Sequence, residues 1–179
     1  MFKKLSFFLL LIIGISSILF AQKPKDYTTR ILFIYDASNS MNGSWNNGRK
    51  HSIAKKLLAQ TVDSLKGKEN LQIALRVYGH QKNYRFGQDC NDTKLEVPFA
   101  YNNHQKVKDK LEEITPMGTT PIAMTLEKSA SDFTPCGTCR NIIILITDGV
   151  EECGGDPCSI SMKLQRKGIV LKPFVIGIG

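Results

Sequence analysis

Apolar positions along the chain fall into two patterns that alternate from one end to the other. One pattern is a short apolar or alternating run, which indicates a strand, and the other is helical spacing. The predicted strands are Ile31–Tyr35, Leu71–Tyr78, Lys94–Phe99, Asn141–Thr147 and Ile169–Ile178. The predicted helices are Lys50–Leu65, a short helix marked by Val107, Leu111 and Ile114, then Pro121–Ser131 and Pro157–Lys167.

Strands that alternate with helices predict a doubly wound α/β fold, with helices on both faces of a mostly parallel sheet. The run "IIILIT" within Asn141–Thr147 is too apolar for a half-exposed strand, so both of its faces must be covered. Lys94–Phe99 alternates and is expected to be an antiparallel edge strand. A sheet of this kind usually closes with another helix. Since Gly179 follows the last strand directly, we expect the C-terminal helix to be missing and the domain to be truncated there.

The N-terminus has the pattern of a secretory signal peptide. Lys3 and Lys4 precede the apolar run Leu5–Phe20, and Ala21 is a small residue at the expected cleavage point. The run is shorter than the roughly 20 residues of a spanning helix, although a retained anchor is the alternative. We expect a signal peptide over 1–21, a short segment over 22–28 and one domain over 29–179. The protein would be exported to the periplasm, the cell surface or the medium, and would meet a membrane only through an uncleaved signal segment.

The net charge and the cysteine content indicate whether the chain binds nucleic acid and whether it forms disulfides. The formal net charge is +8, but no stretch combines Lys and Arg with aromatic residues, so we expect a solvated basic surface and no nucleic-acid partner. Five cysteines in an exported chain indicate disulfides, with at least one left over. We expect a Cys153–Cys158 bridge, and at Cys136 and Cys139 either a short structural disulfide or two plain thiols. Cys90 is then the odd one, although it lies in a loop at the same sheet edge and competes for Cys153.

Polar side chains gather where the strands end. Asp36, Ser38 and Ser40 alternate directly after the first strand, Asp148 follows another, and the segment Thr115–Ala123 adds further hydroxyls. Parallel strands end on one edge, so these groups should converge there. Hard oxygen ligands with little negative charge suit Mg²⁺. Turn chemistry is the alternative explanation for any one of these residues.

Three of these segments, "DASNSM", "GTTPI" and "LITDG", resemble in order and spacing the loops of the von Willebrand factor type A family. The resemblance covers Thr29 to Gly179. It implies a metal-ion-dependent adhesion site for Mg²⁺ or Mn²⁺ and a protein partner whose acidic group completes the metal's shell. The segment "TDGVEECGGDPC" further resembles bacterial, exported members. The implied metal ligands are Asp36, Ser38, Ser40, Thr120 and Asp148.

The remaining candidates concern the rim of this site and enzyme chemistry. Trp45, in a polar loop beside the metal motif, is either a half-buried packing residue or a partner contact at the rim, and Glu151 is a second rim candidate. A metal-dependent or thiol-redox enzyme is the alternative function, and a structural domain whose site never holds a ligand is the third possibility. A phosphatase of the D-x-D-x-T type needs a second acid where this chain has Ser38. The "CGTC" run follows a predicted helix and precedes a strand, which is the reverse of a thioredoxin-like site. We therefore expect a binding module and not an enzyme.

Overall fold

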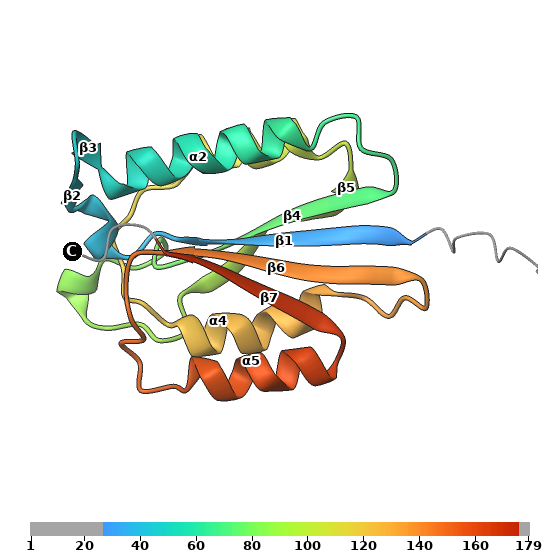
Figure 1. Ribbon diagram of the computed structural model, residues 1–179. Helices are drawn as coiled ribbons and strands as arrows, with labels where there is room; N and C mark the ends of the chain where they lie inside the picture. The colour runs from blue at the N-terminus through green and yellow to red at the C-terminus, as the bar shows by residue number, and fades with distance from the viewer. Residues whose placement is uncertain (1–26, 176–179) are drawn as a thin grey trace, which may run out of the picture.

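The protein has a central five-stranded sheet, which a computed structural model describes over residues 27–175 (Figure 1). The strand order is β5-β4-β1-β6-β7, and only the β4–β5 pair is antiparallel. The strands are β1 (Thr28–Asp36), β4 (Leu71–Tyr78), β5 (Thr93–Tyr101), β6 (Cys139–Thr147) and β7 (Ile169–Val175). The predicted doubly wound, mostly parallel sheet with one antiparallel edge strand is confirmed.

Helices cover both faces of this sheet, as the apolar runs in its strands require. The helices are α2 (Lys50–Ser64), α3 (His104–Glu113), α4 (Ile122–Ser129) and α5 (Pro157–Arg166). In Figure 1, α2 lies above the sheet and α4 and α5 lie below it. α2 and α3 contact each other and share one buried cluster with the sheet, whereas α4 and α5 belong to a second cluster on the other face.

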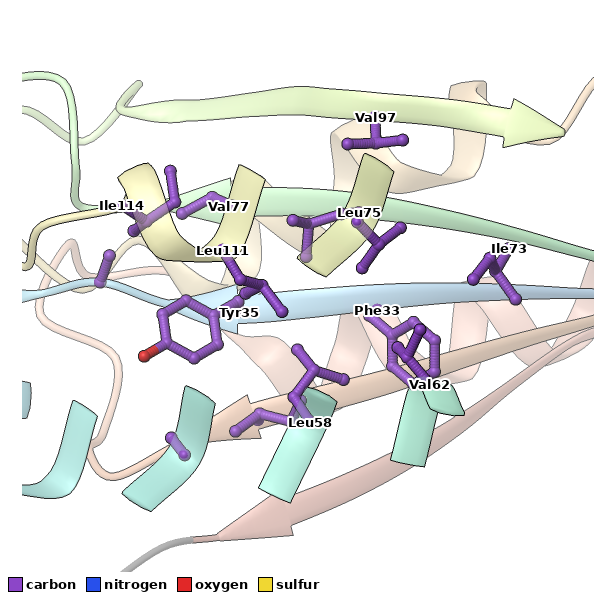
Figure 2. Packing of buried hydrophobic residues seen from close by; sticks show 14 of the residues in the cluster. Phe33, Tyr35, Leu58, Val62, Ile73, Leu75, Val77, Val97, Leu111 and Ile114 are labelled. Atoms are coloured by element: carbon purple, nitrogen blue, oxygen red, sulfur yellow. The ribbon is translucent and has the colours of Figure 1, made fainter. Parts of the chain in front are cut away.

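The α2–α3 side of the core illustrates why the helical spacing was informative. Leu58 and Val62, one turn apart on α2, point toward Phe33 and Tyr35 of β1, and Leu111 of α3 packs beside them (Figure 2). All five side chains are 2% exposed or less. Burial of each contributes roughly 1.5–3 kcal/mol, so the repeat at positions i and i+4 fixes which face of α2 meets the sheet.

Short elements complete the described chain and adjust several predicted bounds. They are η1 (Asn39–Asn42), the two-stranded hairpin of β2 (Ser44–Trp45) and β3 (Gly48–Arg49), η2 (Tyr84–Phe86) and η3 (Ala130–Asp132). The predicted helix Pro121–Ser131 ends as an α-helix at Ser129, and its last turn tightens into η3. The end of the predicted strand Ile169–Ile178, and the signal peptide over 1–21, lie outside the described residues.

An apolar pocket of about 270 Å³ lies between α2 and the β6–β7 side of the sheet. Leu57 of α2, Ile144 of β6 and Phe174 of β7 line it, and Phe174 is 52% exposed. Within residues 27–175, no helix combines the length and the apolar character that a membrane span needs.

Candidate functional site

Asp36, the last residue of β1, is fully buried and held in one orientation. Its Oδ1 accepts a hydrogen bond from the Ser38 backbone N–H at 2.7 Å, and its Oδ2 accepts one from Thr147 Oγ1 at 2.7 Å. Tyr78 donates in turn to Thr147 Oγ1 at 3.1 Å. Burial raises the pKa of Asp36, although the hydrogen bonds from Ser38, Thr147 and Tyr78 act in the opposite direction. No Lys, Arg or His of the described chain forms an ion pair with this carboxylate, so its negative charge lacks a counter-ion.

Asp148 meets the hydroxyls that follow Asp36 at the same sheet edge. β1 and β6 are parallel neighbours, with Tyr35 opposite Ile146, so both strands deliver their following residues to one place. Ser40 Oγ donates to Asp148 Oδ1 at 2.8 Å, and the hydroxyl oxygens of Ser38 and Ser40 lie 2.9 Å apart. The predicted convergence of these polar side chains is therefore found in the fold.

Lys50 contributes a cation that the sequence analysis missed. It is the first residue of α2, and its Nζ donates to Asp148 Oδ2 at 2.8 Å. The Asp148 side chain is 0% exposed and that of Lys50 is 19% exposed, so water screens this pair only partly. One carboxylate of the site is thus charge-paired within the chain, whereas Asp36 is not.

Thr120 reaches the same edge from the turn before α4. It is 1% exposed, and a Cβ added at Gly149 would lie 3.8 Å from both Thr120 Cγ2 and Ser40 Oγ. Thr120 and Ser40 therefore face each other across Gly149. The neighbouring Thr119 turns its hydroxyl away and donates to the Asp89 carbonyl at 2.8 Å.

Two glycines allow these loops to approach each other. Gly79 follows β4 with φ +72°, and a Cβ there would lie 2.7 Å from the backbone nitrogen of Ser38 and from the carbonyl oxygen of Thr119. Gly118 donates to the Gly79 carbonyl at 2.8 Å and forms a parallel bridge with Ser38. The loops after β1 and before α4 are thus joined through backbone atoms, which fixes the spacing of Ser38 and Thr120.

The acidic segment after Asp148 is arranged differently from the prediction. Glu151, the rim candidate, accepts hydrogen bonds from the Ala123 N–H at 2.6 Å and the Cys153 N–H at 2.8 Å. Its carboxylate therefore satisfies backbone donors, one of them in the first turn of α4. Glu152 faces the candidate site instead, because its Oε2 accepts from Thr120 Oγ1 at 2.9 Å and from the Thr120 N–H at 3.1 Å.

The predicted Cys153–Cys158 disulfide is wrong. Cys153 pairs instead with Cys90, the competitor considered above, and Cys158 is free and exposed. Of the two alternatives for Cys136 and Cys139, the structure has the disulfide. Asp156 caps α5 because its carboxylate accepts hydrogen bonds from the N–H groups of Cys158 and Ser159. Cys158 therefore lies in the first turn of the helix. The loop after β4 meanwhile brings Cys90 to the Cys153 segment, with a Cα–Cα distance of 5.6 Å.

Apolar side chains in the loops include one predicted rim candidate and two strongly exposed residues. Trp45 is half-buried in the β2–β3 hairpin and packs against the core, which is the packing alternative. Phe86 of η2 is 81% exposed, and Val150, directly after Gly149, is 76% exposed. Single exposed apolar residues are common, so nothing in the sequence set these two apart.

The enzyme alternatives receive no support from the placement of their residues. Cys139 begins β6 and Asp148 follows its end, so a nine-residue strand, about 30 Å long, separates the "CGTC" disulfide from the site. His80 is engaged with Glu96, at 3.0 Å from Nε2 to Oε1.

Among residues 27–175 no group of three or more His, Cys, Asp or Glu side chains could hold a metal. A metal at this edge would need the hydroxyls of Ser38, Ser40 and Thr120 beside two carboxylates, and such an all-oxygen set fits a hard divalent cation.

The chain is similar in sequence and in fold to several known proteins. The family model for the von Willebrand factor type A domain matches residues 31–179. The uncharacterized protein YwmD of Bacillus subtilis (strain 168) is 32% identical over 172 residues, which are 94% of this chain and 75% of that protein. A crystal structure of an aerotolerance-related membrane protein from Bacteroides fragilis, with multiple mutations to serines, matches with a TM-score of 0.68 and 25% identity, over 83% of this chain and 68% of that one.

A further solved structure extends the likeness of fold. Proximal thread matrix protein 1 from the mussel byssus, with a zinc-occupied MIDAS motif, has a TM-score of 0.67 and 23% identity, over 86% of this chain and 37% of that one. The family model covers most of the chain, and the matching structures share its sheet and helices. The chain therefore belongs to the von Willebrand factor type A domain family.

Proposed function

We propose that this protein is an exported, metal-dependent protein-binding module and not an enzyme. Its site would bind Mg²⁺ or Mn²⁺ through Asp36, Ser38, Ser40, Thr120 and Asp148, and the bound ion would receive an acidic side chain of a partner protein. The zinc-occupied MIDAS motif of the mussel protein supports a divalent cation at this position of the fold. The signal-peptide pattern at the N-terminus supports export.

The observation that carries the proposal is the fully buried Asp36 carboxylate without a counter-ion. Burying a charge is costly unless it is paired, and here oriented hydrogen bonds hold the carboxylate beside Ser38. A divalent cation would supply the missing positive charge. With only two carboxylates as formal anionic ligands, the cation would keep its affinity for one more acidic group. The protein's own part is to hold the oxygen atoms in place and to keep bulk water from Asp36.

The metal is tested first. At ten times the dissociation constant, a ligand that binds only the native state stabilises it by about 1.4 kcal/mol, or roughly 2–4 °C in melting temperature at this size. Mg²⁺ and Mn²⁺ should produce this shift in the wild type and none in Asp36→Ala. Asp109→Ala, which removes a carboxylate on α3 away from the site, is the control and should keep the shift. An equal shift in Asp36→Ala would place the metal elsewhere.

The partner is tested second. A protein captured from the native cell envelope and identified by crosslinking should be released by a chelator. Titration of that purified partner should show binding to the Mg²⁺-loaded wild type, no binding after chelation, and about ten- to a hundredfold weaker binding to Thr120→Ala. Equal affinity in all three cases would mean that the metal is structural and that partners bind another face.

A further inference from the structure

Glu152 is the acidic residue of the site that the metal proposal leaves without a role. Its backbone and carboxylate both bond to one residue, Thr120, which is a proposed metal ligand. Oε2 accepts from Thr120 Oγ1 at 2.9 Å and from the Thr120 N–H at 3.1 Å, while the Glu152 N–H donates to the Thr120 carbonyl at 3.1 Å. These three hydrogen bonds join two residues that are 32 positions apart in the sequence, so the fold itself positions the Glu152 carboxylate at Thr120.

The carboxylate accepts the N–H of the buried Thr120, but an uncharged oxygen could accept the same hydrogen bond, so this contact does not require a negative charge. Glu152 is exposed, so its charge would be well solvated if the side chain turned outward. The adjacent Glu151 already satisfies the backbone N–H groups of Ala123 and Cys153. Glu152 is instead turned inward onto Thr120, where it adds a negative charge next to a proposed metal ligand. That orientation is explained if the charge belongs to the site.

The segment that carries Glu152 is clamped, so its carboxylate is held ready at Thr120. Gln88 Nε2 donates to the Glu152 carbonyl at 2.7 Å, and the following residue, Cys153, is disulfide-bonded to Cys90. The loop after β4 therefore holds the backbone that follows the Glu152 side chain, and the bond from the Glu152 N–H to the Thr120 carbonyl holds the backbone before it. A carboxylate that is already ordered binds without a further loss of conformational entropy.

We infer that Glu152 is an internal acidic ligand of this site, which occupies the side of Thr120 where a partner's carboxylate would be received. This inference rests on the proposed metal-dependent binding function. With the metal bound, the Glu152 carboxylate competes with an external carboxylate, and a partner has to displace it. In the resting protein the site would therefore hold the Glu152 carboxylate weakly. A partner's carboxylate that binds more tightly would replace it.

The test measures acetate binding to the Mn²⁺-loaded protein. With protein in excess over Mn²⁺, water-proton relaxation reports water on the bound ion, and acetate lowers it as it binds. Glu152→Gln should bind acetate about tenfold more tightly than the wild type, since one competing charge-assisted contact is gone. Glu152→Asp keeps the charge but is one methylene shorter, so on a clamped segment it should also bind acetate more tightly. Glu127→Gln, an exposed acid on α4, should behave as the wild type.

The outcomes separate this inference from the function on which it rests. Mn²⁺ binding that is absent in the wild type, or unchanged in Asp36→Ala, would overturn the metal-dependent function and the inference together. Mn²⁺ binding that requires Asp36, with equal or weaker acetate binding in Glu152→Gln, would overturn the role of Glu152 alone. Tighter acetate binding in Glu152→Gln but not in Glu152→Asp would show a general effect of charge, which also contradicts an internal ligand.

Discussion

Among single residues, Asp36 has the most unusual environment, because the fold buries its charge without a cation. A raised pKa in the folded state means that the stability linked to this group is fully present below its unfolded pKa and is lost as pH rises through its folded pKa. The metal-free protein at neutral pH should therefore gain stability when this charge is removed.

Asp36→Asn tests this expectation with nearly unchanged shape. In the presence of a chelator at pH 7–8 the variant should melt higher than the wild type, by about 2–4 °C for each kcal/mol gained. The difference should shrink as the pH is lowered, because the raised pKa lets the wild-type carboxyl take up its proton above the usual range of an aspartate. Differential scanning calorimetry at a series of pH values provides the measurement. A lower melting temperature at every pH would mean that the hydrogen bonds from Ser38 and Thr147 outweigh the cost of burial.

Lys50 is the second informative residue, because its ammonium lies 2.8 Å from an oxygen of Asp148. A metal that uses Asp148 has to share it with this cation. Lys50→Met should therefore tighten Mn²⁺ binding by about tenfold, the equivalent of one charge-assisted contact, as measured by calorimetric titration. Lys56→Met, an exposed position on the same helix, removes an equal charge and should leave the affinity unchanged. Weaker binding in Lys50→Met would instead assign Lys50 to holding Asp148 in place.

Among the elements, the ends of β1 and β4 depend on a backbone contact that only glycine permits. Gly79→Ala would place a Cβ 2.7 Å from the Ser38 nitrogen, so the loop after β1 has to move. Gly67→Ala is a matched control: its φ is +73°, close to the +72° of Gly79, but nothing lies within 4 Å of an added Cβ. The control should cost about 1–2 kcal/mol for its conformation.

Gly79→Ala should cost more than the control in chemical denaturation and should also lose the metal-dependent rise in melting temperature. The reason is that Ser38 and Thr120 are spaced by the bridge that Gly79 supports. If Gly79→Ala kept the metal-dependent rise in melting temperature, the hydroxyls of Ser38 and Thr120 would reach the ion without the backbone bridge.

The elements themselves were largely predictable from the sequence. β1 and β6 are central strands covered on both faces, so their residues had to be apolar almost without interruption, and this is a strong local signal. The candidate ligands were found because strand ends and hydroxyl-rich loops are also local features. The 3₁₀ ending after α4 and the β2–β3 hairpin were missed, because short turns depend on the packing around them.

The contacts that complete the site were not predictable, because they join distant parts of the chain. Lys50 begins a helix and gave no sign of its pairing with Asp148, which is 98 positions away. Cys158 is five residues from Cys153 and Cys90 is 63 residues away, yet Cys153 is bonded to Cys90. Sequence distance favoured the wrong pair, since it carries no information about how the loop after β4 folds back.

For the whole molecule, the Cys90–Cys153 disulfide closes a long stretch of chain. By the chain-entropy estimate the Cys90–Cys153 bond, with a sequence separation of 63, contributes about 4 kcal/mol, whereas the Cys136–Cys139 bond, with a separation of 3, contributes only about 2 kcal/mol. The double variant Cys90→Ser with Cys153→Ser should therefore lose about twice as much stability to unfolding by urea as Cys136→Ser with Cys139→Ser. Peptide mapping of the oxidised wild type should recover Cys90 joined to Cys153, and a Cys153–Cys158 peptide would contradict this pairing.

The central position of β1 and β6 has a mechanical consequence. Asp36 is the last residue of β1 and Asp148 follows the last residue of β6, while β1 begins at Thr28 on the opposite edge of the sheet (Figure 1). A partner that pulls on a metal held there, against a chain held before Thr28, would load β1 along its length. β1 is hydrogen-bonded to β4 and β6 in parallel register along its length, so these bonds would be sheared together and could not be peeled apart one at a time. The sheet would thus resist a pulling force on the partner through all the hydrogen bonds of β1 acting together.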